Sequence, residues 1–273
     1  MTNDFSFKWF AEQPFYRTVN SAFLELVEVV PGQHILELAC GTGAVTKLIL
    51  ERVRGAKQGL VIGLDASASA IKEAMDHLGT VRDGAAQFVQ SQIEHLSEVI
   101  KERVDTVIFC NGIHYISDKD QLLEDISGTL HNGGVFAFNT SFFRGAHLPE
   151  TEQFYRRWMF KAIRLLRSQR GLMPKADRVQ ARQQLSPEEY FELIQQHGFS
   201  VVRHTVQTTQ VPLEGWLGIS RFEDFVRGAL PGVPLKEASE TLQEAVKLTF
   251  QEMALTFVPR NWLSVVALKE GKA

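Results

Sequence analysis

Two acidic side chains flank a glycine turn near the start of the chain. Glu37 lies inside an apolar run, and the turn Gly41-Thr42-Gly43 follows that run. Glycines leave the backbone amides of such a turn open to a ligand at the start of the next helix. Asp65 ends a second apolar run 22 positions after Gly43, where a carboxylate suits the two hydroxyls of a ribose. The spacing therefore predicts a ligand that contains a nucleoside.

The third position of the glycine pattern separates two classes of ligand. A dinucleotide site uses G-x-G-x-x-G, in which the third glycine lets the helix pack closely on the strand. That position is Thr46 in this chain. A carboxylate at Glu37 would repel a pyrophosphate, but it suits a ligand that carries an ammonium and a sulfonium. A nicotinamide-dependent oxidoreductase is therefore the less favoured alternative.

The stretch from Glu37 to Gly43, together with Asp65, resembles motifs I and II of class I S-adenosylmethionine-dependent methyltransferases. It looks most like the branch that contains ubiquinone, menaquinone and natural-product methyltransferases. The resemblance implies S-adenosylmethionine as methyl donor and S-adenosylhomocysteine as product. It also implies a Rossmann-like α/β fold, a doubly wound sheet of seven mostly parallel strands with an antiparallel last strand.

The resemblance also implies which residues hold each part of the donor. Glu37 would serve the methionine end, and Asp65 would take the ribose hydroxyls. Tyr16, on an N-terminal helix, would contact the donor as that helix folds over it. The remaining candidates are Ala39, Gly41, Thr42 and Gly43 around the turn, Ala66, Gln92 and Ile93 for the adenine, and Asn111 after the fourth strand.

Hydrophobic patterning predicts strands that alternate with helices. Apolar runs predict strands near 34–39, 59–65, 104–110, 135–140, 199–211 and 262–268, and the segment 87–94 is predicted to contain a further strand and its exit. Ser67 and Ser186 are predicted helix N-caps. Ser186 is followed by a proline and two acidic residues, which would form the first turn of its helix. Asn132-Gly133-Gly134 is predicted to end a helix over 117–130. This alternation is typical of a doubly wound parallel sheet.

Polar residues after the fourth predicted strand are candidates for chemistry, because ligands of open α/β sheets bind at the carboxyl ends of the strands. His114 and Tyr115 are predicted to line the acceptor pocket, together with Trp158. His114 is the candidate general base if the acceptor must lose a proton. A purely structural role for this histidine is the alternative.

Two segments, 143–184 and 213–259, interrupt the alternation, and we expect them to form a helical cap within a single methyltransferase domain spanning 1–273. Nine basic residues and one acid, Asp177, lie between positions 156 and 182. A solvated basic face explains this bias most simply. The alternatives are an anionic or carrier-bound acceptor and contact with a membrane surface. Nucleic acid is the least favoured partner, since no binding module accompanies the charge.

Composition places the chain among ordinary globular proteins. It has 273 residues, 44% of them hydrophobic, and a formal net charge of −3. No apolar run approaches the ~20 residues that span a bilayer, and the N-terminus lacks a signal-peptide pattern. Two cysteines, Cys40 and Cys110, suit buried packing rather than a disulfide or a metal. We expect a cytoplasmic enzyme without a metal.

The predicted function is methyl transfer from S-adenosylmethionine to a small-molecule or lipid-like acceptor, with oxygen or carbon as the favoured atom. A non-catalytic protein that binds S-adenosylmethionine is the main alternative, because such folds can keep the donor site and lose the acceptor.

Overall fold

The structure is a computed structural model that describes residues 5–53, 59–78, 85–175 and 184–271. The chain forms two compact units. The sheet unit contains Arg17–Ala146, Gln184–Gln207 and Trp262–Ala273. The helical unit contains Met1–Tyr16, His147–Gln183 and Thr208–Asn261.

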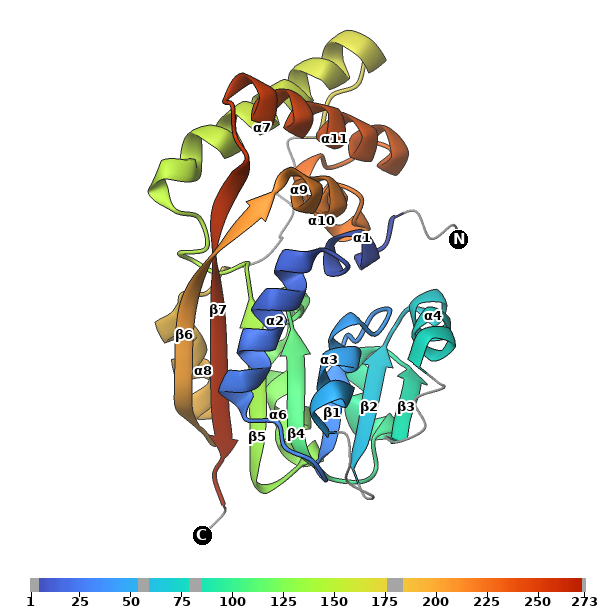
Figure 1. The fold of residues 1–273 in the computed structure, drawn as a ribbon, viewed down its shortest axis with the longest axis vertical. Helices are drawn as coiled ribbons and strands as arrows, with labels where there is room; N and C mark the ends of the chain where they lie inside the picture. The colour runs from blue at the N-terminus through green and yellow to red at the C-terminus, as the bar shows by residue number, and fades with distance from the viewer. Residues whose placement is uncertain (1–4, 54–58, 79–84, 176–183, 272–273) are drawn as a thin grey trace. The chain divides into compact units, whose positions relative to one another are not determined.

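A sheet of seven strands forms the centre of the sheet unit, in the order β3-β2-β1-β4-β5-β7-β6 (Figure 1). The first five strands pair in parallel, and β7 runs antiparallel to β5. This is the predicted Rossmann-like sheet with its antiparallel last strand. The strands are β1 (His34–Leu38), β2 (Leu60–Asp65), β3 (Ala85–Gln90), β4 (Val104–Cys110), β5 (Leu130–Thr140), β6 (Phe199–Pro212) and β7 (Phe257–Lys269).

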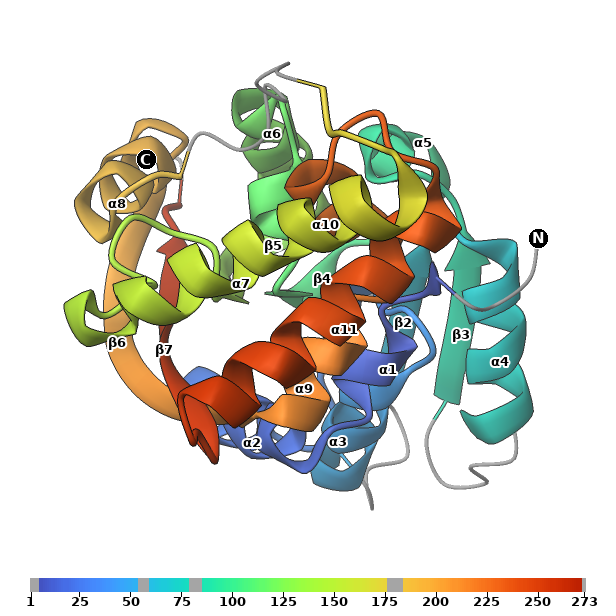
Figure 2. The same cartoon turned by 90° about the horizontal axis from the view of Figure 1, so that it is seen from above.

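Helices cover both faces of this sheet, as Figures 1 and 2 show. Right-handed crossovers put the helices that follow β1 and β2 on one face and those that precede and follow β4 on the other. The first face carries α2 (Pro14–Val27), α3 (Ala44–Val53) and α4 (Ala68–Leu78). The second carries α5 (Leu96–Val99), α6 (Lys119–Thr129) and α8 (Pro187–Gln196).

The central strands are apolar because both of their faces are covered. Leu36, Leu38, Val107 and Phe109 are fully buried in the core between the sheet and its helices. Continuous apolar runs of this kind are characteristic of parallel strands. Each such side chain contributes roughly 1.5–3 kcal/mol of transfer free energy, so the core holds the carboxyl ends of β1 and β4 side by side.

Both predicted N-caps are confirmed. The Ser67 hydroxyl accepts a hydrogen bond from the Ala70 amide at 3.3 Å. Ser186 and Glu189 form a reciprocal capping box at the start of α8. These bonds satisfy amide groups that the first helical turn leaves without intrahelical partners.

Two predicted boundaries are wrong. Helix α6 ends at Thr129, and β5 begins at Leu130. The glycines at 133 and 134 therefore lie within the strand, near a register shift between β4 and β5, rather than at the helix end. β7 begins at Phe257, five residues before the predicted start.

The helical unit contains α1 (Lys8–Ala11), α7 (Glu152–Leu165), the π-helical turn η5 (Leu166–Arg170), α9 (Leu213–Ile219), α10 (Glu223–Ala229) and α11 (Leu235–Glu252). Helices α7 and α11 lie side by side (Figure 2). The two inserted segments supply all of these helices except α1. Their role as a cap stays a prediction.

Candidate functional site

Asp65 is fixed against the glycine turn by two backbone amides. Its Oδ2 atom accepts a hydrogen bond from the Gly41 amide at 2.8 Å, and its Oδ1 atom accepts one from the Ser67 amide at 2.8 Å. The side chain is half-buried at the carboxyl end of β2. A carboxylate has about four lone-pair sites, so these two bonds leave capacity for the hydroxyls of a ribose.

The turn itself has an unusual backbone. Ala39, Gly41 and Gly43 have φ angles of 52°, 55° and 85°, in the left-handed region that favours glycine. A side chain added at Gly41 would meet no atom within 4 Å, whereas one added at Gly43 would lie 2.6 Å from Leu78 Cδ1. The backbone at Gly41 therefore faces open space that a ligand can enter.

Glu37 is a buried acid in the middle of the sheet. Its side chain is 2% exposed, and the Thr46 hydroxyl donates a hydrogen bond to Oε2 at 2.5 Å. Burial raises the pKa of Glu37 to about 8, and the bond from Thr46 opposes that rise. A cationic group beside this carboxyl would favour its charged form. The residue at the missing third glycine is thus part of the site, a role that the sequence pattern did not indicate.

Asn111 follows β4 with a φ of 50° and is fully enclosed. Its Oδ1 atom accepts hydrogen bonds from the Ser141 amide at 2.9 Å and the Ser141 hydroxyl at 3.1 Å. These donors fix which end of the amide is oxygen. The buried Nδ2 atom has no hydrogen-bond partner among the described residues. An unsatisfied buried donor is costly, so this nitrogen suits an acceptor atom on a ligand.

A second asparagine supports this position. The Asn111 amide donates to Asn139 Oδ1 at 3.0 Å, and Asn139 Nδ2 donates to Asn20 Oδ1 at 2.9 Å. Asn20 and Asn139 are fully buried. This network joins α2, β4 and β5, and nothing in the sequence pattern signals it, because its members lie far apart in the chain.

His114 lies on a short 3₁₀ turn (Ile113–Tyr115) after β4 and is 2% exposed. Its Nδ1 atom is 3.1 Å from Thr140 Oγ1, and its ring stacks on Phe142 with the centroids 4.4 Å apart. The Tyr115 ring contacts the imidazole at a tilt of 44°, with the ring centroids 4.1 Å apart. These contacts fix the imidazole at the carboxyl ends of β4 and β5. Nε2 can accept a proton only in the tautomer in which Nδ1 donates to Thr140.

The residues predicted to contact the adenine follow the carboxyl ends of β2 and β3, on the same side of the sheet as the residues above. Ala66 and Gln92 are exposed, and Ile93 is partly buried at the start of a 3₁₀ turn. The Ser91 amide donates to the Asp65 carbonyl at 3.0 Å, which holds the end of β3 beside that of β2. The sheet unit therefore brings together Glu37, the glycine turn, Asp65, the adenine candidates, Asn111 and His114.

Tyr16 and Trp158 belong to the helical unit. Tyr16 is buried against Phe7 and Phe10. Trp158 is 1% exposed, and its indole nitrogen donates to the Leu242 carbonyl at 2.9 Å. This packing favours a structural role for Trp158. The predicted contacts of Tyr16 and Trp158 with a ligand remain predictions.

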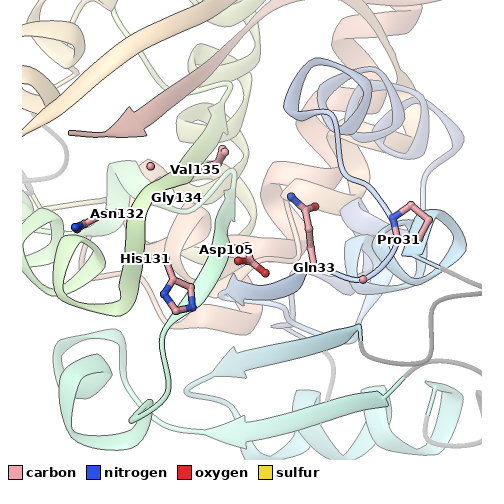
Figure 3. A pocket seen from close by; sticks show the side chains of 9 residues that line it. Pro31, Gln33, Asp105, His131, Asn132, Gly134 and Val135 are labelled. Atoms are coloured by element: carbon pink, nitrogen blue, oxygen red, sulfur yellow. The ribbon is translucent and has the colours of Figure 1, made fainter. Parts of the chain in front are cut away.

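A cavity in the sheet unit lies at the other edge of the sheet. Figure 3 shows Gln33, Asp105 and His131 on its wall, near the amino ends of β1, β4 and β5. The Asp105 carboxylate there accepts a hydrogen bond from the His34 amide at 2.8 Å. None of the predicted site residues lines this cavity.

The two cysteines are buried free thiols, and burial raises the pKa of both Cys40 and Cys110. Among the residues that the structure describes, no three His, Cys, Asp or Glu side chains are arranged to hold a metal. Within the same residues, no helix combines the length and the apolar character needed to cross a bilayer.

Comparison with known proteins identifies the family. Residues 36–136 match the sequence family described as "Methyltransferase domain". An uncharacterized methyltransferase from Geobacillus thermodenitrificans is 30% identical over 194 residues, which cover 68% of this chain and 79% of the relative. A cyclopropane synthase structure from Mycobacterium tuberculosis shares the fold, with a TM-score of 0.59 and 13% identity over 98% of this chain and 95% of that one.

Two further relatives carry more specific descriptions. A trans-aconitate 2-methyltransferase from Paracidovorax citrulli is 30% identical over 41% of this chain and 42% of its own length. A ubiquinone/menaquinone biosynthesis C-methyltransferase from Stenotrophomonas maltophilia is 31% identical over 44% of this chain and 46% of its own length. The chain belongs to the S-adenosylmethionine-dependent methyltransferase family. The resemblance noted in its sequence is thereby confirmed.

Proposed function

We propose that the protein transfers the methyl group of S-adenosylmethionine to an oxygen or carbon atom of a small-molecule or lipid-like acceptor. The observation that best supports this proposal is the buried Glu37 carboxyl beside the turn that Asp65 anchors. A buried acid next to an open glycine backbone suits a ligand that is cationic at one end and a nucleoside at the other. A pyrophosphate would oppose the ionisation of Glu37 and gain no attraction from it.

Each of the residues predicted to bind S-adenosylmethionine would contact a different part of it. Glu37, held by Thr46, would face the ammonium, and Asp65 would accept hydrogen bonds from the ribose hydroxyls. Gln92 would accept one from the adenine amino group through its carbonyl oxygen, and Ile93 and Ala66 would lie against the ring. Asn111 Nδ2 would donate to an acceptor atom of the ligand, which would end its lack of a partner.

His114 would act as the base when the acceptor is protonated. S-adenosylmethionine supplies an electrophilic methyl group with a good leaving group. His114 Nε2 would take the proton that an acceptor hydroxyl or activated carbon loses as its new bond to the methyl carbon forms. Thr140 would keep the imidazole oriented by accepting the hydrogen of Nδ1. Fixed positions for base and donor can lower the barrier by ~7–11 kcal/mol.

The descriptions of two relatives support the class of acceptor. One is named for trans-aconitate, an acidic metabolite, and one for a carbon methylation in quinone biosynthesis. We therefore place acidic small molecules and phenolic quinone precursors first among candidate acceptors.

Transfer of a labelled methyl group tests the proposal. The protein would be incubated with deuterium-labelled S-adenosylmethionine and a panel of acidic metabolites and phenols, and the products would be analysed by mass spectrometry. Stoichiometric formation of labelled product and S-adenosylhomocysteine is the expected result. Tight donor binding without transfer to any acceptor of either class would instead favour a non-catalytic binding protein.

A further inference from the structure

Helix α7 of the helical unit presents three different faces. The face that points inward carries Phe154, Trp158 and Ala162, all buried. Residues three or four positions apart share a helix face, so the side chains next to this stripe and those opposite to it form two further sets. Of the nine basic residues noted in the sequence, Arg178 and Arg182 lie outside the described residues and Lys175 follows the π-helical turn η5. The other six divide between these two sets.

The set next to the buried stripe is paired with acids of α11. Arg157 and Lys161 both form ion pairs with Glu252, and Arg170 pairs with Glu240 at 2.8 Å. Gln169 donates to Glu244 at 3.4 Å. The three glutamates are spaced by multiples of four along α11 and so lie on one face. The basic side chains of this set are therefore paired with acids inside the helical unit.

The set opposite to the buried stripe is turned to solvent and mixes apolar with basic side chains. Phe160 is 68% exposed and Ile163 is 38% exposed. Arg164 and Arg167 are exposed beside them, and no acid lies within ion-pair distance of either among the described residues. Arg156, one turn before Phe160, meets Glu152 at 3.8 Å in a solvated pair. We call these five residues, Arg156, Phe160, Ile163, Arg164 and Arg167, the outer face of α7, which extends to Arg167 in the π-helical turn η5 that continues the helix.

We propose that the outer face of α7 docks on an anionic lipid surface. An amphipathic helix binds a bilayer in its interface plane when aromatic and aliphatic side chains enter the headgroup region and basic side chains meet anionic lipids. The outer face has this composition, with Phe160 and Ile163 between arginines. The charge is complementary to anionic headgroups. Arg164 and Arg167 have no acid within ion-pair distance among the described residues, and Arg156 meets Glu152 only in an exposed pair at 3.8 Å.

A lipid surface fits this face better than a protein partner does. Specific protein interfaces bury about 800 Å² on each side around an apolar core. Two exposed apolar side chains on one helix are few for such a core. The same two side chains are enough to insert among headgroups when several arginines add their attraction. The proposal does not depend on the methyl-transfer activity.

Vesicle co-sedimentation of the full-length protein tests the proposal. We expect the protein to sediment with vesicles of phosphatidylcholine and phosphatidylglycerol in equal parts, and not with phosphatidylcholine alone. Because each basic residue near an anionic surface adds about fivefold to binding, Arg164→Glu/Arg167→Glu should weaken it at least ~10-fold. Phe160→Ser should weaken it without any change in charge.

Matched variants elsewhere serve as controls. Lys72→Glu/Lys101→Glu makes the same change of charge at exposed positions, and Met75→Ser removes another exposed apolar side chain, 54% exposed. Both controls should bind as the wild type does, and circular dichroism would verify that each variant is folded. Wild-type protein that ignores anionic vesicles at physiological ionic strength would overturn the proposal, even if it bound an acidic protein. Equal losses in the control and outer-face variants would overturn it too.

Discussion

The Thr46 hydroxyl donates a hydrogen bond of 2.5 Å to the Glu37 carboxyl, and both side chains are buried. Thr46 stands where a dinucleotide-binding turn would have its third glycine. In a dinucleotide-binding site, a side chain at this position would obstruct close packing of the helix on the strand. In this chain the Thr46 side chain instead holds Glu37 in place. The missing glycine and the acid inside the strand are therefore one feature of the site.

The first prediction concerns this hydrogen bond. Thr46→Val keeps the shape of the side chain but removes the donor, so the pKa of Glu37 should rise further. Hydrogen bonds to a charged group contribute ~1.5–3 kcal/mol, so affinity for S-adenosylmethionine at neutral pH should fall roughly tenfold or more. Calorimetric titration measures this. Thr46→Ser, which keeps the hydroxyl, should retain most of the affinity, and equal losses in both variants would contradict the account.

Glu37 should also make donor binding depend on pH. Its pKa is raised by burial to about 8, so the carboxyl is largely protonated at pH 7, and a cationic ligand favours its ionisation. Affinity should increase as the pH rises toward about 8, where the ammonium of the ligand begins to lose its own proton. Titrations in buffers with different ionisation enthalpies should reveal proton release at pH 7. Glu37→Gln should abolish that release, and an unchanged proton count in this variant would exclude Glu37 as its source.

The same shift predicts a pH dependence of stability. The folded pKa of about 8 lies above the ordinary value of 4.5, so the unfolded chain ionises first. The contribution of neutral Glu37 to the free energy of unfolding is therefore fully present below pH 4.5, and it is lost as the pH rises through about 8. Burial of this acid should cost a few kcal/mol at alkaline pH. Denaturant unfolding across pH 5–9 should show this slope in the wild type and a shallower one in Glu37→Gln.

His114 should affect turnover but not donor binding. His114→Ala should lower the rate by about 10²–10⁴ with a protonated acceptor and leave affinity for S-adenosylmethionine near that of the wild type. Thr140→Val should lower the rate less and change the pH profile of turnover, because it removes only the bond that orients Nδ1. Unchanged turnover in His114→Ala would assign this residue to packing against Phe142.

The sheet could be predicted from the sequence because buried parallel strands must be continuously apolar, as β1 and β4 are. The start of β5 could not, since Leu130 joins the sheet through pairing with Val104 and not through any local signal. The same limit applies to the site. Asp65 and the turn are recognisable by spacing, whereas the bond from Thr46 to Glu37 and the asparagine network depend on how distant segments meet.

The basic segment shows this limit in another way. Its excess of arginine and lysine is obvious in the sequence, but the division into paired and unpaired sets is not. Arg157 and Glu252 are 95 positions apart and meet only because α7 lies beside α11. Sequence patterning could therefore indicate a charged helix but not which of its charges remain available.

Parallel titrations with S-adenosylmethionine, S-adenosylhomocysteine and NADH test the central claim most directly. The wild type should bind the first two and not NADH. Asp65→Ala, which removes the ribose acceptor and the anchor of Gly41, should weaken both by about 10-fold or more. Asp118→Ala removes a comparable side chain to backbone bond at α6 and should leave affinity unchanged. Wild-type affinity in Asp65→Ala, or binding of NADH alone, would contradict the account.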